Sequence, residues 1–370
     1  MLIMAIDHIR DLTHVSSLTQ DPTDLSTTTV GLFLTRWITH LCAPTFVFLS
    51  GASAYLSFKN QQNVVESKQF LISRGLWLIL LEFTVINFAV WFDFHFRVFM
   101  FQVIGAIGCG FIILSFFLKL KPKTIGIIGL IIVFGHNALQ GIPVESTFLK
   151  YGIAPLFASN LYQITPNMGL LINYPVIPWL GIMMAGFGFG QLLEIPERKK
   201  RLLQIGLGAI LFFIILRFSN LYGDPQKWAV QKDDISTFLS FINVTKYAPS
   251  LLYVLITLGI SIILLSFTDG LKNRFISIVS VYGKVPLFYY LLHWYLIRFI
   301  TFIILFSQGF GWKDFNFGPF QFGRPKAPSG VELPVVYLIW LGLVIFLYPL
   351  CKWYGNYKLS HPEKKWLRYL

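Results

Sequence analysis

Charged side chains are scarce in this chain. Asp, Glu, Lys and Arg make up 13% of the 370 residues, and apolar residues make up 55%. Soluble domains carry about 25% charged residues, and a soluble protein cannot bury this much apolar surface in one core. The composition therefore excludes a soluble enzyme, a disordered chain and a coiled coil. It indicates a protein whose solvent is mostly lipid.

Cysteine is rare as well. Cys42, Cys109 and Cys351 are odd in number and form no CxxC motif, so they predict neither a disulfide framework nor a zinc site. The histidines form no pair at metal-ligand spacing, and we expect no metal. The opening MLIMAI is too short for the apolar core of a secretory signal peptide.

The net charge of +13 invites a nucleic-acid interpretation. Nucleic-acid binding needs a continuous basic patch or stripe. Here the cations form short clusters between long apolar runs, as in the loops of membrane proteins. We therefore expect a lipid bilayer as the partner and no nucleic acid.

Nine apolar runs are long enough to cross a membrane, since a span needs about 20 apolar residues. They lie at about 31–56, 75–93, 98–118, 124–140, 169–192, 203–219, 248–267, 284–306 and 332–352. Residues 1–9 resemble the outer end of a further helix whose beginning is missing. The predicted fold is an all-α, polytopic integral membrane bundle of about ten helices, forming one domain over 1–370.

The Lys and Arg residues predict the orientation. Alternate connecting segments carry 17 of them and the intervening segments carry nine, which places both termini in the cytoplasm. The stretches 141–168, 220–247 and 307–331 then lie outside, and their aromatic content predicts a cap over an outward-facing cavity. The AGFGFG motif at 185–190 lies inside a span, where small residues permit close helix approach.

Several ionisable or polar residues lie at membrane depth, where they are costly and mark function by default. They are Asp7, His8, Arg36, His40, Glu82, His136, Asn137 and His293. All except Glu82 are expected in the outer half of the membrane, with His293 in the outer half of its span. Glu82 is expected to pair with a neighbour.

Two interpretations of this set stay open. The residues could form a structural polar network that fixes helix packing, with Arg36 extending to the outer interface. Alternatively they converge on one cavity, where an imidazole beside a carboxylate acts as a general base near neutral pH.

Several longer strings resemble one known family. They are MAIDHIRD (4–11), FLTRWITHLCAPTFVFLSG (33–51), SRGLW (73–77), GHN (135–137), YPVIPWLG (174–181), NVTKYAPSLL (243–252), GKVPLFYYLLH (283–293) and KKWLRYL (364–370). In this order they resemble the bacterial branch of the heparan-alpha-glucosaminide N-acetyltransferase catalytic-domain family. The resemblance implies a multi-pass acyltransferase of the bacterial inner membrane. It would transfer an acetyl group from cytosolic acetyl-CoA to an amine or hydroxyl of an envelope sugar or glycan outside.

The resemblance also implies roles for particular residues. The working histidine of the family lies in the first outer loop, so His8 and His14 are both candidates for the base, beside Asp7. Arg36 or Asn137 would stabilise the oxyanion, and His40 belongs to a motif of the bacterial branch. The residues assigned to acceptor binding are His136, Asn137, His293, Lys246 and Tyr247.

The phosphates of acetyl-CoA would contact Lys284 or the basic cluster that includes Arg198 and Lys199, although orientation alone also explains that cluster. A transporter or permease, in which the same residues bind solute or relay protons, is the alternative from another class. Transporters of this size often show two related halves, and no such symmetry is visible. A non-catalytic membrane scaffold and a homo-oligomer also stay open.

Overall fold

The computed structural model describes residues 1–139, 146 and 148–369. Its contacts divide the chain into two compact units, each assembled from separate segments. Unit 1 comprises Met1–Cys42, Thr84–Val98 and Gly270–Leu370, and unit 2 comprises Ala43–Phe83 and Phe99–Asp269. The single domain expected over 1–370 stays a prediction.

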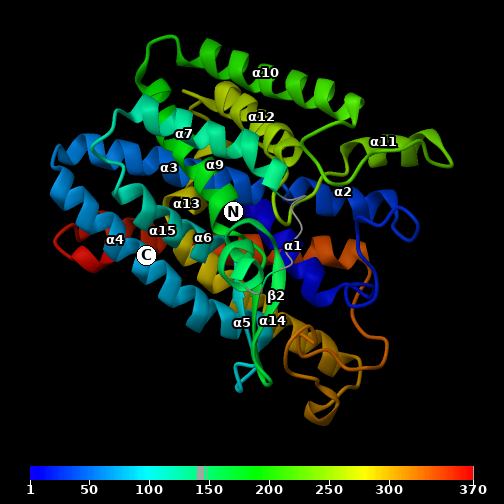
Figure 1. Cartoon of the computed structure of the whole chain (residues 1–370). Helices are drawn as coiled ribbons and strands as arrows, with labels where there is room; N and C mark the ends of the chain where they lie inside the picture. The colour runs from blue at the N-terminus through cyan, green and yellow to red at the C-terminus, as the bar shows by residue number, and fades with distance from the viewer. Residues whose placement is uncertain (140–145, 147, 370) are drawn as a thin grey trace. The chain divides into compact units, whose positions relative to one another are not determined.

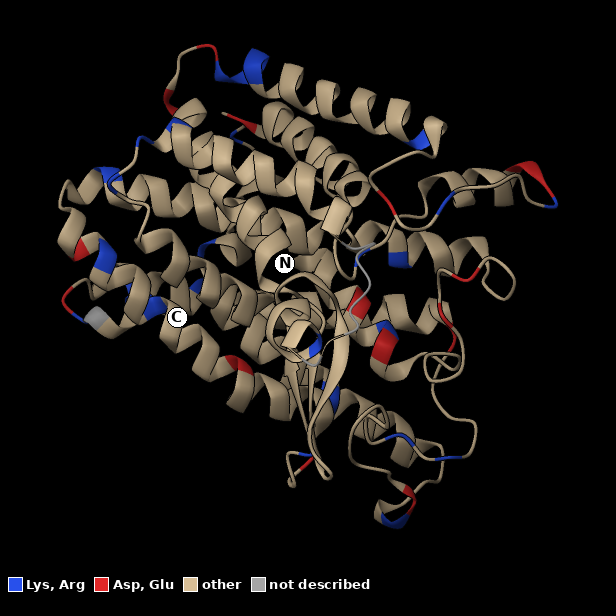
Figure 2. Ribbon diagram, in the orientation of Figure 1, with Lys and Arg blue, Asp and Glu red and all other residues tan. Residues whose placement is uncertain are grey.

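The described part of the chain contains eight helical stretches that are long and apolar enough to span a membrane. They are Val30–Gln61, Val64–Trp91, Pro122–Leu139, Val176–Glu194, Arg198–Ser219, Leu251–Thr268, Pro286–Ser307 and Leu333–Ser360. Charged residues lie mostly at their ends and in the loops (Figure 2). The helical polytopic membrane fold is thereby confirmed, whereas ten spans and the orientation stay predictions.

Two of the expected spans form shorter helices. Helix α1 (Leu2–Thr13) has 12 residues and α6 (Val103–Ser115) has 13, fewer than the roughly 20 that a straight span needs. The run expected at 98–118 is shortened because its first residues form strand β1 (Val98–Phe101).

Unit 1 is built around α1, which packs against α2, α14 and α15. Its helices are α1, α2 (Val30–Thr39), α5 (Asn87–Trp91), α13 (Arg274–Lys284), α14 (Pro286–Ser307), η5 (Trp312–Asp314), α15 (Leu333–Ser360) and η6 (Lys365–Tyr369). Prolines stand in the first turns of α14 and α15, where a missing N–H costs nothing.

Unit 2 contains three tightly packed helix pairs, α4 with α6, α7 with α9, and α10 with α12 (Figure 1). Its helices are α3 (Cys42–Gln61), α4 (Val64–Leu81), α6, α7 (Pro122–Gly135), η2 (His136–Leu139), η3 (Leu149–Ile153), α8 (Ala154–Phe157), α9 (Val176–Phe189), η4 (Gly190–Glu194), α10 (Arg198–Ser219), α11 (Asp234–Ile242) and α12 (Leu251–Thr268). The π-helical turn η1 (Glu82–Ile86) continues α4 towards α5.

Glycines allow these helices to approach closely. A Cβ added at Gly186, inside the AGFGFG motif, would lie 2.0 Å from the carbonyl oxygen of Phe48. The same pattern recurs at Gly75 and Gly108, where each added Cβ would collide with the other glycine's carbonyl oxygen. The close helix approach predicted for AGFGFG is confirmed.

A small three-stranded sheet accompanies the helices of this otherwise helical fold. The strand order is β1–β3–β2, and β2 (Asn160–Thr165) pairs antiparallel with β3 (Met168–Ile172). The span expected at 169–192 therefore begins as a strand, and α9 starts only at Val176. Of the loop expected at 141–168, residues 141–145 and 147 lie outside the described residues.

Candidate functional site

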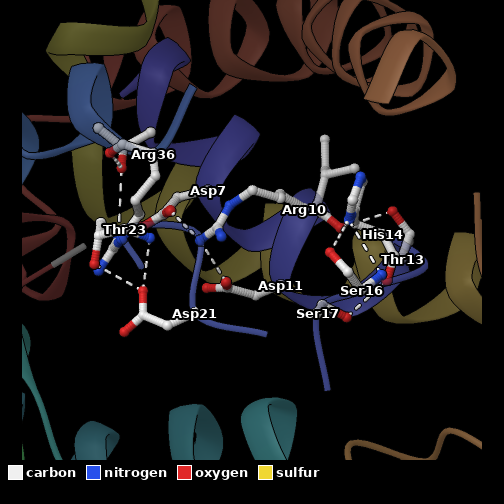
Figure 3. A network of polar contacts seen from close by, with 12 residues as sticks. Asp7, Arg10, Asp11, Thr13, His14, Ser16, Ser17, Asp21, Thr23 and Arg36 are labelled. Atoms are coloured by element: carbon white, nitrogen blue, oxygen red, sulfur yellow. Dashed lines mark hydrogen bonds and ion pairs between the residues drawn. The ribbon is translucent and has the colours of Figure 1, made fainter. Parts of the chain in front are cut away.

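A buried ion-pair network lies on α1 and α2 in unit 1 (Figure 3). One oxygen of Asp7 accepts a hydrogen bond from Arg10 at 2.8 Å, and the other accepts one from Arg36 at 2.5 Å. Arg10 also contacts Asp11 at 2.6 Å. Sequence analysis paired Asp7 with an imidazole and did not single out Arg10. The spacing could have predicted the Asp7–Arg10 pair, because an Arg three residues after an Asp lies on the same face of a helix.

His8 lies next to this network and contacts α14. Its ring centroid is 4.0 Å from that of Trp294 and 5.3 Å from that of His293. His293 in turn stacks on Tyr289, with centroids 5.4 Å apart and an interplanar angle of 14°. Asp7, His8, Arg36 and His293, all selected from the sequence, therefore belong to one cluster within unit 1.

The cluster contains buried polar atoms that have no hydrogen-bond partner among the described residues. They include Nε2 of His293 and the hydroxyl oxygen of Tyr289, and both side chains are fully buried. Buried polar atoms are normally hydrogen-bonded, and an exception calls for a water, ion or ligand. This part of unit 1 is thus suited to receive a polar group of a bound molecule.

The depth expected for His293 stays a prediction. His293 lies in the N-terminal half of α14, which has 22 residues from Pro286 to Ser307. In the predicted orientation that half faces the cytoplasm, so the predicted orientation and the expected outer-half depth do not agree with each other. The expected and observed starts of the helix differ by only two residues.

His40 lies at a break between two helices. It is the C-terminal cap of α2, one turn after Arg36, and its side chain is buried. Pro44 explains the break, because its ring has no N–H and would clash with the carbonyl of residue 40 in a continuous helix. The span expected at 31–56 corresponds to the stretch Val30–Gln61, which consists of two helices, α2 and α3.

His14 caps the C-terminus of α1 in an extended conformation. Its Nδ1 atom lies 3.0 Å from the hydroxyl of Ser16 and 3.3 Å from the main-chain N–H of the same residue. Because a main-chain N–H only donates, Nδ1 accepts, and the neutral ring carries its hydrogen on Nε2. Sequence analysis missed Ser16.

The surroundings of His14 favour the neutral imidazole. Burial lowers its pKa; Glu332 opposes this shift, while Arg10 and Arg324 add to it. A histidine with a lowered pKa is unprotonated at neutral pH, which is the state that a general base requires. His14 thus has the protonation state expected of a base, with its basic atom directed at Ser16.

A buried arginine attaches the segment 307–331 to the chain around His14. Arg324 donates to the carbonyl oxygens of Leu12 at 3.2 Å and His14 at 3.3 Å, and it also binds Ser329. The main chain continues the attachment, because Val331 donates to the carbonyl of Thr13 at 2.8 Å. The expected cap over a cavity stays a prediction, but this segment does fix the position of His14.

His136 and Asn137 lie in unit 2, and their contacts attach the start of α12. Nε2 of His136 is 2.6 Å from the carbonyl oxygen of Pro249, and its Nδ1 is 2.9 Å from that of Val133. The Asn137 side chain accepts a hydrogen bond from the N–H of Leu251 at 2.8 Å. The structure gives both residues a packing role in this unit. Their role in acceptor binding, and a cavity shared with Asp7 and His8, stay predictions.

Lys246 and Tyr247 lie just before this corner of unit 2. The Lys246 ammonium is 5.1 Å from the centroid of the Tyr247 ring, and that ring lies 5.7 Å from Tyr174. Arg217, buried on α10, donates to four carbonyl oxygens of the stretch 226–243 that precedes them. The two residues are therefore held by an ordered loop, and their acceptor role stays a prediction.

Glu82 caps a helix. Its side chain is fully buried at the start of η1, and Oε2 accepts a hydrogen bond from the N–H of Gly105 at 2.6 Å. Gly105 is in the first turn of α6, where a carboxylate also interacts favourably with the helix dipole. The expected pairing of Glu82 with a neighbour is confirmed, with a main-chain partner.

The residues predicted to contact the phosphates of acetyl-CoA differ in their own contacts. Lys284 is exposed at the C-terminal end of α13 in unit 1. Arg198, in unit 2, is paired with Asp269 at 2.7 Å, and the carbonyl of Lys199 accepts a bond from Ser266. Among the described residues, no group of three or more His, Cys, Asp or Glu could hold a metal ion.

Sequence analysis also missed Arg298 on α14. This side chain is buried and donates to the carbonyl oxygens of Ala89, Val90 and Phe322. These bonds satisfy the C-terminal end of α5 and hold the 320–322 turn. An arginine inside an apolar run was the available signal, because such a residue needs buried partners.

Comparison with protein families gives a match for the N-terminal part of the chain. Residues 1–219 match the family described as heparan-alpha-glucosaminide N-acetyltransferase, catalytic. The match covers α1 and α2, hence Asp7, His8, His14 and Arg36, and ends before α14. Comparison with curated proteins and with solved structures gives no significant match. Because the match covers more than half of its 370 residues, the chain belongs to the heparan-alpha-glucosaminide N-acetyltransferase catalytic family of membrane acetyltransferases.

Proposed function

We propose that this protein transfers an acetyl group from cytosolic acetyl-CoA to an amine or hydroxyl of an envelope sugar or glycan on the outer side of a bacterial inner membrane. The family supports acetyl transfer. The observation that carries the site is the contact of His8 with Trp294 and His293, next to the buried Asp7–Arg36 pair.

His8 or His14 acts as the general base. The acceptor nitrogen or oxygen attacks the thioester carbonyl carbon while the histidine takes its proton, and the carbonyl oxygen becomes an oxyanion. Arg36, which pairs with Asp7 next to His8, is the charged donor that stabilises that oxyanion. When the intermediate collapses, the carbon–sulfur bond breaks and the CoA thiolate leaves, to be protonated to the thiol.

Lys284 supports entry of the donor from the cytoplasmic side. It lies two residues before α14, and the helical rise of about 1.5 Å per residue places His293 roughly 10 Å along the axis from Pro286, the first residue of that helix. A donor whose phosphate contacts Lys284 would need an arm of that length to bring its thioester to His8 and His293. Arg198 is a weaker candidate, because Asp269 already neutralises it.

An acetyl-CoA consumption assay tests the proposal. The purified protein in nanodiscs receives acetyl-CoA with a panel of amino sugars and envelope glycans, and the free CoA thiol is measured. We expect His8→Ala or His14→Ala to lower the rate by about 10²–10⁴, the usual loss for a general base, and to leave acetyl-CoA binding intact. His95→Ala is the matched control, since His95 is exposed.

Two results contradict parts of the proposal. If His8→Ala and His14→Ala both keep full activity, the base lies elsewhere, and His40 and His293 become the next variants. If no acetyl-CoA is consumed while a solute crosses the membrane, the protein is a transporter.

A further inference from the structure

An apolar groove lies within unit 2 and is lined by α7, α9, α10 and α12. Figure 1 shows these four helices. Its volume is about 670 Å³, within the range of about 300–1,000 Å³ that small-molecule sites occupy. Leu130, Ala185, Phe212 and Leu258 line it, one from each helix. The catalytic proposal uses none of these residues.

The groove is open because small residues stand where side chains would fill it. Gly126, Gly188 and Gly208 are all on its lining. A Cβ added at Gly208 meets no atom within 4 Å, whereas one at Gly206 would lie 2.6 Å from Ile263. Gly206 thus serves the packing of α10 on α12, and Gly208 leaves space in the groove.

Only two lining residues are polar, and both lie at one end. Lys123 is in the first turn of α7, and Gln191 is in η4 directly after α9. The start of α7 and the end of α9 lie against each other, because a Cβ added at Gly188 on α9 would touch the main chain of Gly126 and Pro122 on α7. Among the described residues that line the groove, none is acidic. The groove therefore combines a long apolar wall with one cationic end, where the dipole of α7 adds positive potential.

We propose that this groove is a binding site for an anionic membrane phospholipid, with a hydrocarbon chain between α7 and α10 and the phosphate at Lys123 and Gln191. The open side of the groove is apolar, since Leu130 and Phe212 are 48% and 38% exposed, and hydrocarbon is the medium at that depth. In the predicted orientation Lys123 faces the cytoplasmic leaflet, which carries the anionic lipids that basic residues attract.

Photocrosslinking tests this site directly. The protein is placed in phosphatidylcholine nanodiscs containing phosphatidylglycerol with a diazirine in one acyl chain, and labelled peptides are mapped by mass spectrometry. We expect labels on the 126–134 and 205–212 segments. Gly208→Phe fills the groove without a backbone clash and should abolish these labels. Gly342→Phe on α15, where an added Cβ also meets nothing within 4 Å, is the matched control.

A charge variant separates a specific site from nonspecific lipid contact. Lys123→Gln should weaken capture of phosphatidylglycerol about fivefold, the effect of one cation near an anionic headgroup, and leave capture of diazirine-tailed phosphatidylcholine unchanged. Lys272→Gln, at an exposed lysine outside the groove, is its control. Equal labelling in Gly208→Phe and Gly342→Phe, equal capture of both lipids, or a dimer that excludes the probe would each overturn the proposal. Gel filtration and melting curves verify that every variant folds.

Discussion

At the scale of single residues, Asp7 is the acidic centre of the buried network in unit 1. Its carboxylate faces Arg10 and Arg36, and the exposed fractions of the three side chains are 8%, 4% and 12%. Removing one member of a buried ion pair costs about 3–5 kcal/mol, mostly because the remaining charge stays buried. Asp7 has two cationic partners, so its loss should have the larger effect.

We therefore expect Asp7→Asn to lower the free energy of unfolding by about 3–5 kcal/mol, and Arg36→Gln by less, because Arg10 still neutralises Asp7. The double variant should lose less than the sum of the two. Denaturant unfolding in detergent micelles measures these differences. Glu363→Gln, at an exposed residue, should stay within about 0.5 kcal/mol. Additive losses in the double variant would show that Asp7 and Arg36 are not coupled.

His14 makes a prediction about pH. Its pKa is lowered, so the ring loses its proton below the ordinary value of about 6.5 and is already neutral there. If His14 is the base, kcat/KM stays on its plateau at pH 6.5 and falls only when the pH drops through the lowered pKa. A pH profile of acetyl transfer measures this decrease in kcat/KM on the acidic side, the acidic limb of the profile. An acidic limb centred above pH 6.5 would assign the base to another group.

At the scale of elements, the loop 307–331 is more than a connection, because Arg324 joins it to the end of α1. We expect Arg324→Gln to increase hydrogen exchange at residues 12–17 and 329–331, since several main-chain carbonyls lose their donor. Lys326→Gln, exposed in the same loop, should leave the exchange unchanged.

Arg324→Gln also removes a positive charge that lowers the pKa of His14. The acidic limb of the activity profile should therefore move to higher pH. A loop that is only structural would lower the rate without moving this limb. An unchanged limb together with unchanged exchange would remove Arg324 as a positioning residue.

At the scale of the whole molecule, the open question is orientation. The 17-to-nine distribution of cations predicts both termini inside. In a variant without Cys42, Cys109 and Cys351, single cysteines at positions 119–123 or at Lys364 should resist an impermeant thiol reagent in intact cells. A cysteine at Lys313 should react. Labelling of the 196–201 segment from outside would reverse the assignment.

Much of the fold could be predicted from the sequence. Apolar runs identify membrane helices because hydrocarbon supplies no hydrogen-bond partner for the backbone, and a helix satisfies its own. The same rule wrongly predicted helix at the starts of 98–118 and 169–192, because the first residues of these apolar runs form β1 and β3. Hydrophobicity is the same for a strand and a helix of that length, and the neighbour of β1 in the sheet, β3, lies far along the chain.

The sequence by itself determined the membrane class, the helix positions and the family, and it selected Asp7, His8, Arg36 and His293 as polar residues out of place in lipid. Only the tertiary structure decided their partners. Arg36 reaches Asp7 and His8 reaches His293 because α1 packs against α2 and α14 in one rotation and register. In α14, a mostly apolar helix, periodicity does not specify which face meets α1. Contacts between helices decide it, as in the pairing of Arg36 on α2 with Asp7 on α1.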